Sequence, residues 1–133
     1  MQFQFEKFTA TDTSFDARVT IRRTGQIGFN TGAINSYGLK DYSFVILYFD
    51  RQERAVGIQL TNEHAPGAIV LKKSDSNTYV RAKNFCDRYE IGYSKSRKFA
   101  LRKDTETGFL YFRLDEENQA SDREGVEGEE TEE

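Results

Sequence analysis

The chain has 133 residues, the length of about one domain, and a formal net charge of −3. Its single cysteine excludes a disulfide framework and a cysteine-based metal site, and any histidine-based metal site or catalytic pair would depend on a single histidine. No apolar run has the length of a signal-peptide core or a membrane span, and no phosphate-binding glycine loop is present. We therefore expect a cytoplasmic protein that needs no cofactor.

Alternation of apolar and polar residues predicts strands near the amino terminus. Residues 1–8 alternate phenylalanine with polar residues, which is typical of a half-exposed strand, and a polar loop follows at 9–16. Two more alternating runs, at 19–21 and 27–29, flank a turn at 23–26 and form a predicted hairpin.

A short helix is predicted between this hairpin and the next one. Asn30 is a favourable N-cap for a helix over residues 31–37, and Gly38 is placed to end it. The run YSFVILYF at 42–49 is apolar on both faces and rich in aromatic and β-branched residues, which predicts a strand buried on both sides. A turn at 50–54 joins it to a partner strand that contains Val56, Ile58 and Leu60.

The second half of the chain predicts the same order of elements after a linker at 61–67. A strand is expected at 68–71 and a turn at 74–77. Apolar residues spaced i, i+3, i+4 and i+7 within 82–89 predict one face of a helix, and a basic loop follows at 92–98. The last hairpin is predicted from Phe99–Leu101 and Phe109–Phe112.

The two halves can be overlaid as pseudo-repeats that cover about 17–60 and 68–114. The overlay shifts residues 19–39 by 52 positions and residues 45–60 by 54 positions. Few identities are kept, so the alternative is that any two hairpin-bearing segments would overlay as well. The sequence thus predicts a mostly β fold in which two units of hairpin, short helix and hairpin form one shared β-barrel.

The stretch TGQIGFNTGAINSYGL, followed by a hairpin, resembles the swapped-hairpin domain of the AbrB, MazE and SpoVT family of transition regulators and antitoxins. Two such units in one chain resemble the tandem arrangement of the MraZ proteins. The resemblance implies an interlocked barrel with a DNA-binding basic face, and hence transcription regulation. This chain departs from the family pattern at positions that are usually basic or proline, namely Gln26, Asn30, Ile34 and Asn35.

Basic residues gather before the two equivalent turns, on the second helix, and in the loop and strand that follow it. Lysine and arginine neutralise phosphates and release counterions, which gives binding that does not depend on base sequence. The alternative is that these are ordinary solvated side chains. The candidate nucleic-acid contacts are Arg22, Arg23, Lys72, Lys73, Arg81, Lys83, Lys95, Arg97, Lys98, Arg102 and Lys103.

Residues 115–133 form an acidic tail with ten acids, one arginine and no aromatic residue. The tail therefore carries −9, which leaves +6 on the globular domain predicted over residues 1–114. Such a segment cannot bury enough apolar surface to offset its ordering entropy, so we predict that it is disordered. A tethered polyanion is expected to modulate DNA binding, to bind a protein partner, or only to aid solubility.

Two other functions fit the sequence. The 11 phenylalanines and 7 tyrosines all precede the tail, and exposed rings such as Tyr42, Tyr93 or Tyr111 would stack on single-stranded nucleic acid. The other is an antitoxin-like interaction module without nucleic-acid binding. Catalysis is not expected, because His64 lies in the linker and Cys86 on the apolar face of its helix. A pseudo-dimeric monomer and a homodimer both remain open.

Overall fold

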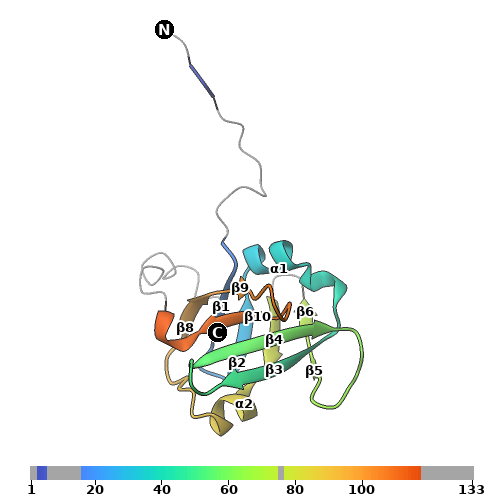
Figure 1. Ribbon diagram of the computed structural model, residues 1–133, viewed down its shortest axis with the longest axis vertical. Helices are drawn as coiled ribbons and strands as arrows, with labels where there is room; N and C mark the ends of the chain where they lie inside the picture. Colours follow the sequence, from blue (N-terminus) through green and yellow to red (C-terminus); the bar gives the residue numbers. More distant parts are fainter. Residues whose placement is uncertain (1–2, 6–15, 75–76, 118–133) are drawn as a thin grey trace.

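The computed structural model describes residues 3–5, 16–74 and 77–117. Within these ranges ten strands form two antiparallel sheets (Figure 1). Sheet A contains, in spatial order, β6 (Lys72–Ser74), β7 (Asn77–Arg81), β2 (Gln26–Phe29), β1 (Arg18–Ile21) and β8 (Arg97–Ala100). Sheet B contains β5 (Ile69–Val70), β3 (Phe44–Asp50), β4 (Ala55–Thr61), β10 (Leu110–Arg113) and β9 (Arg102–Lys103). The mostly β fold is therefore confirmed.

The two sheets pack face to face around one apolar core. The side chains of Val19 and Ile21 point inward from sheet A, and those of Val56 and Ile58 point inward from sheet B; all four are fully buried. Phe99 of β8 meets Phe112 of β10 across the interface, with 5.0 Å between the ring centroids. Alternation thus sends every second side chain of each sheet to the core and the others to the opposite, outer face.

The chain crosses between the sheets at two buried leucines. Leu71 separates β5 in sheet B from β6 in sheet A, and Leu101 separates β8 in sheet A from β9 in sheet B. A strand that changes sheets makes a corner of the structure, and its hydrogen-bonded pairing changes partner there. Because pairing is interrupted at both corners, the predicted shared barrel is not closed, and two separate sheets form instead.

The helices lie at opposite ends of the two sheets (Figure 1). In α1 (Thr31–Tyr37) the Asn30 side chain accepts a hydrogen bond of 2.8 Å from the backbone N of Ala33, and Gly38 ends the helix with φ = 63°. The predicted N-cap and stop are thus both confirmed. The other helices are α2 (Lys83–Arg88), η2 (Leu39–Asp41) and η3 (Leu114–Glu116). None of the helices in the described ranges is long and apolar enough for a membrane crossing.

Three strand predictions are wrong. Phe99 and Ala100 pair with β1 in sheet A and so form no hairpin with 109–112, because the strand that pairs with β10 across the last turn is β9. Residues 3–5, the described part of the strand predicted at 1–8, are not in a strand, and Phe3 and Phe5 are exposed. The strand predicted at 42–49 begins at Phe44 and is buried on one face only, since Tyr48 on its other face is 42% exposed. The reason is that both α-helices lie at the ends of the sheets, so neither covers the outer face of sheet B.

The chain remains attached to the body after β10. The backbone N of Leu114 donates to the carbonyl of Arg54 at 2.9 Å, and η3 follows directly. Glu117 then forms an isolated antiparallel bridge with Phe99 at the edge of sheet A. Residues 115–117 therefore belong to the described body, three residues beyond the predicted boundary. The disorder predicted for the rest of the tail falls on residues 118–133, which lie outside the described ranges, and stays a prediction.

Candidate nucleic-acid interface

Charge is segregated in sheet A. Its five strands contain six lysines and arginines and no acidic residue: Arg18, Lys72, Lys73, Arg81, Arg97 and Lys98. Residues that lie directly opposite each other in a sheet share a face. Thr20, between buried Val19 and Ile21, faces outward and lies opposite both Gly28 and Lys98. Tyr79 lies opposite Gly28 and Lys72, so these residues face outward as well. With Arg22, which continues β1, the outward cations are Arg18, Arg22, Lys72, Arg81 and Lys98. We call these five residues the sheet A cations.

Arg22 lies across the middle of this outer face. Its guanidinium donates hydrogen bonds to Oε1 of Gln26 at 3.0 Å and to Oδ1 of Asn77 at 2.9 Å. Its Cζ atom is 5.7 Å from the centroid of the Tyr79 ring. A side chain at Gly28 would overlap this guanidinium, so the glycine provides the space in which it lies. These two bonds to amide oxygens hold the planar guanidinium in position over Gly28.

Two of the sheet A cations have free side chains. Lys72 and Arg81 are exposed, and neither side chain forms a hydrogen bond or an ion pair with another described residue. Arg18 is 3.8 Å from the carboxylate of Asp16, which is a weak exposed pair. Lys72 and Arg81 therefore give the outer face of sheet A positive charge that no described side chain pairs.

Several predicted contacts are directed elsewhere. Lys73 lies opposite buried Thr78, and its Nζ donates to the carbonyls of Lys40 and Tyr42 at 3.2 and 2.6 Å. Arg97 lies opposite buried Ile21 and pairs with Glu117 at 3.2 Å. These two cations therefore stabilise the fold locally and are not part of the outer face.

The remaining candidates are dispersed. Arg23 lies in the turn between β1 and β2, and Lys83 at the start of α2 pairs with Asp87 at 3.2 Å. Lys95 is exposed in the loop before β8. Arg102 belongs to sheet B, where it pairs with Glu116 at 2.7 Å, and Lys103 lines a small pocket beside Tyr37 and Tyr42. The structure thus brings together Arg22, Lys72, Arg81 and Lys98 of the predicted set, and adds Arg18.

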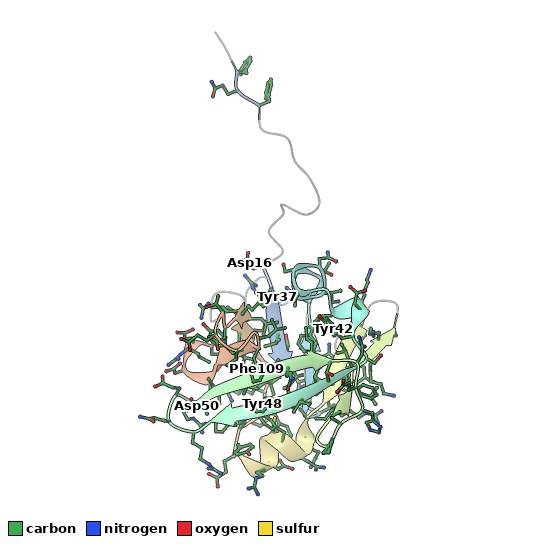
Figure 2. The ribbon with its side chains drawn as sticks, turned by 45° about the vertical axis from the view of Figure 1, so that its right-hand side comes forward. Asp16, Tyr37, Tyr42, Tyr48, Asp50 and Phe109 are labelled. Atoms are coloured by element: carbon green, nitrogen blue, oxygen red, sulfur yellow. The ribbon has the colours of Figure 1, made fainter. Side chains whose placement is uncertain are left out.

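The outer face of sheet B is aromatic instead. The rings of Tyr48 and Phe109 stack with centroids 4.7 Å apart, over the middle of β3 and β4 (Figure 2). The Tyr48 hydroxyl donates to Oε1 of Gln59 at 2.7 Å. An open groove of about 880 Å³ is lined by these two rings, by Tyr111 and by Gly57 beneath them. The molecule therefore has two unlike faces, one cationic and one aromatic.

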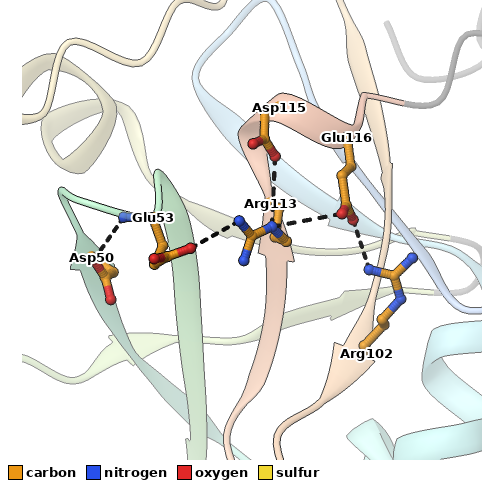
Figure 3. Close-up of polar contacts among 6 residues, drawn as sticks. All are labelled: Asp50, Glu53, Arg102, Arg113, Asp115 and Glu116. Carbon is orange, nitrogen blue, oxygen red and sulfur yellow. Dashed lines mark hydrogen bonds and ion pairs between the residues drawn. The ribbon is translucent and has the colours of Figure 1, made fainter.

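An ion-pair network fastens η3 to the end of sheet B (Figure 3). Arg113 lies 3.0 Å from Glu53 and 3.6 Å from both Asp115 and Glu116. Glu116 also accepts the hydrogen bond from Arg102. Exposed pairs of this kind contribute little to stability, so the network positions the end of the body more than it stabilises the fold. It also pairs the charges of Arg102 and Arg113 with acidic side chains.

Replacing Arg102 by alanine should raise the pKa of Glu116. The hydrogen bond from Arg102 is the main cause that holds this pKa below its ordinary value. Because the folded pKa is lower than the unfolded one, the pair stabilises the protein above the unfolded value of about 4.3, and this contribution disappears as the pH falls through the folded pKa. Carboxyl NMR titration of both proteins measures the shift. Arg97→Ala is the control, and an unchanged Glu116 midpoint in Arg102→Ala would contradict the assignment.

Cys86 is fully buried, as predicted, on the inner side of α2. Burial, with a smaller effect from the charge of Asp87, raises the pKa of its thiol to about 11. We therefore expect no reaction with a thiol reagent at neutral pH in the native protein, and complete reaction after unfolding in guanidinium, because the thiolate is the reactive form. Mass spectrometry of iodoacetamide-treated samples measures both. Rapid labelling in native buffer would show that α2 opens.

Neither a family model, nor a curated protein, nor a solved structure matches this chain. The resemblance to the AbrB, MazE and SpoVT family is thus without support from these comparisons. Among the described residues, no group of three or more histidine, cysteine, aspartate or glutamate side chains is arranged to hold a metal ion. The cationic face of sheet A and the aromatic face of sheet B are therefore the features of the described chain that bear on function.

Proposed function

We propose that the protein is a non-catalytic DNA-binding protein and that the outer face of sheet A contacts the phosphate backbone. The observation that carries this proposal is the segregation of charge, with six cations and no acid in five adjacent strands. Such a surface attracts a polyanion and binds it by releasing counterions. Regulation of transcription is the role that fits this activity and the AbrB-like resemblance.

The span of the face suits a duplex. Lys72 and Lys98 lie at the two ends of a row that crosses all five strands through Tyr79, Gly28 and Thr20. Four strand spacings make this row about 19 Å long. Phosphates on both sides of a DNA groove about 12 Å wide lie within that reach. The end cations would then contact the two backbones while the centre of the sheet faces the groove.

Arg22 is the proposed residue for contact with bases. Lysines and arginines on phosphates position a protein, whereas base edges are read by side chains held in a fixed geometry. The guanidinium of Arg22 is fixed by Gln26 and Asn77 over Gly28, near the centre of the row. A planar guanidinium is the usual partner of guanine in the major groove.

A salt-dependent comparison of probes tests the proposal. Fluorescence anisotropy with a labelled duplex and a single strand of equal length should show binding at 50 mM salt. If the four sheet A cations other than Arg22 contact phosphates, the duplex affinity should fall about 150-fold between 50 and 200 mM salt. An affinity that does not depend on salt would contradict a phosphate-binding face. Binding to neither probe would favour the interaction module.

A second candidate function rests on the exposed stack of Tyr48 and Phe109. Rings of this kind bind successive bases of a single strand at about 1–3 kcal/mol per base. If this second function is correct, the protein binds the single strand more tightly than the duplex. Tyr48→Leu should then weaken single-strand binding and leave duplex binding unchanged. Equal single-strand affinity in Tyr48→Leu and wild type would remove this candidate.

We also infer that the two halves descend from one doubled unit. In support, the order strand, strand, helix, strand, strand recurs when β5–β6 and β8–β9 are each counted as one strand that bends at a leucine, and β2 pairs with β7 in sheet A as β4 pairs with β10 in sheet B. The pairing of Gly57 with Tyr111 matches the 54-residue shift of the sequence overlay, as a local twofold axis at this pair would require. In sheet A, Ile27 lies opposite Val80, one position beyond the overlay. The 52-residue shift would place Ile27, which faces the core, on Tyr79, which faces outward. The sequence overlay must therefore be shifted by one residue in this strand, because equivalent residues must lie on the same face.

A further inference from the structure

The described chain ends at the edge of the cationic face. Glu117 bridges Phe99 on the free side of β8, which is the edge strand of sheet A, and its carboxylate lies 3.2 Å from Nε of Arg97. Lys98, one of the sheet A cations, lies between these two partners in the sequence. The rest of the chain therefore starts at the free edge of β8, from which the outer face of sheet A is one strand edge away.

The remaining segment is complementary to that face in charge and sufficient in length. Residues 118–133 hold seven acids and one arginine, a net charge of −6, against the five sheet A cations. Sixteen extended residues span up to about 53 Å. The five strands of sheet A are only about 19 Å across, so the segment can cross the whole face.

We propose that residues 118–133 bind across the outer face of sheet A of the same chain and compete there with nucleic acid. The competition rests on the proposed function, whereas the contact itself does not. A short tether gives the segment a millimolar effective concentration at the face, so each exposed pair needs to contribute little. The segment thereby limits non-specific binding, and DNA that makes additional contacts, such as those of Arg22, displaces it.

A spin label on the full-length chain tests the contact without DNA. Thr131→Cys introduces a reactive thiol, while buried Cys86 stays unlabelled. At low salt the nitroxide should reduce amide signals of β1, β2 and β7 more than those of β3 and β4, and high salt should restore them, because screening weakens the attraction. Equal effects on both sheets, or effects on sheet B alone, would overturn the proposal.

DNA affinity tests the competition with matched charge changes. The tail variant carries Glu129→Gln, Glu130→Gln and Glu132→Gln, and the control carries Asp41→Asn, Glu63→Gln and Glu106→Gln at exposed positions outside sheet A. A segment that occupies the face nine-tenths of the time weakens apparent affinity about tenfold, so the tail variant should regain a large part of that factor and the control should not.

The two experiments separate this inference from the proposed function. Selective loss of sheet A signals in a protein that does not bind DNA would leave the contact standing and remove the proposed function. DNA binding with equal affinity in wild type and tail variant, and no selective signal loss, would remove the contact and leave the proposed function standing.

Discussion

Replacing Lys72, Arg81 and Lys98 together by alanine should weaken duplex binding by about two orders of magnitude at about 0.1 M salt. Each of these cations points outward from a different strand of sheet A. Each lost phosphate contact lowers the salt slope by about 0.9, so the slope should fall by about 2.7. The affinity should fall by a similar factor for every duplex sequence, because phosphates carry no sequence information.

The control removes the same charge elsewhere. Lys40, Arg51 and Lys103 are exposed, and none of them lies in sheet A. Their joint replacement by alanine changes the net charge equally and should leave the salt slope nearly unchanged. If both triple variants lose the same affinity, the effect is one of net charge, and the outer face of sheet A is not the binding surface.

Replacing Gly25 by alanine should lower the free energy of unfolding by about 2–5 kcal/mol. Gly25 has φ = 86°, where a side chain costs about 1–2 kcal/mol. A Cβ there would also lie 2.7 Å from the Cβ and 2.9 Å from the Cα of Lys83, and overpacking of this kind costs about 1–3 kcal/mol. The turn cannot move away freely, because the Gly25 carbonyl accepts a 3.0 Å hydrogen bond from Ala82. Urea denaturation measures the loss.

Alanine substitutions at two other glycines separate the cost of backbone strain from the cost of a steric clash. Gly108 has φ = 79° but nothing within 4 Å of an added Cβ, so its replacement by alanine should cost only the strain of about 1–2 kcal/mol. Gly92 has open space as well and no positive φ, so Gly92→Ala should change stability very little. A loss in Gly25→Ala no larger than in Gly108→Ala would show that the contact between the turn and α2 is soft.

Local signals predicted the elements well. Asn30 and Gly38 marked both ends of α1, and the alternation of Val19, Ile21 and Ile27 located β1 and β2. These features act over a few residues, so the sequence contains them directly. Burial of Cys86 followed from helical periodicity in the same way.

The candidate site depends on pairing that is remote in sequence. Arg18, Thr20 and Arg22 alternate with buried residues. The same alternation in the sequence could have predicted Arg18 as a contact, but the predicted set of nucleic-acid contacts did not include it. That β7 would pair with β2, and so place Tyr79 beside Arg22, had no local signal. The same holds for Lys73, whose core-side position follows from its register with β7.

The exposed face of sheet B was predicted wrongly for a related reason. The apolar run around Tyr48 reads as a strand covered on both sides, which holds only if another layer lies over it. Nothing in the run itself tells whether a helix will cover the outer face. In the described chain the helices lie at the ends of the sheets, and the aromatic side chains line an open groove instead.

An NMR titration of the isotope-labelled full-length protein with a duplex tests the central claim most directly, because it maps the contact residue by residue. The account predicts that the backbone amides of Thr20, Gly28 and Tyr79, in the middle of sheet A, shift on addition of DNA, while those of Tyr48 and Gly57 in sheet B do not. Shifts confined to sheet B would contradict the assignment of the outer face of sheet A as the DNA-binding surface.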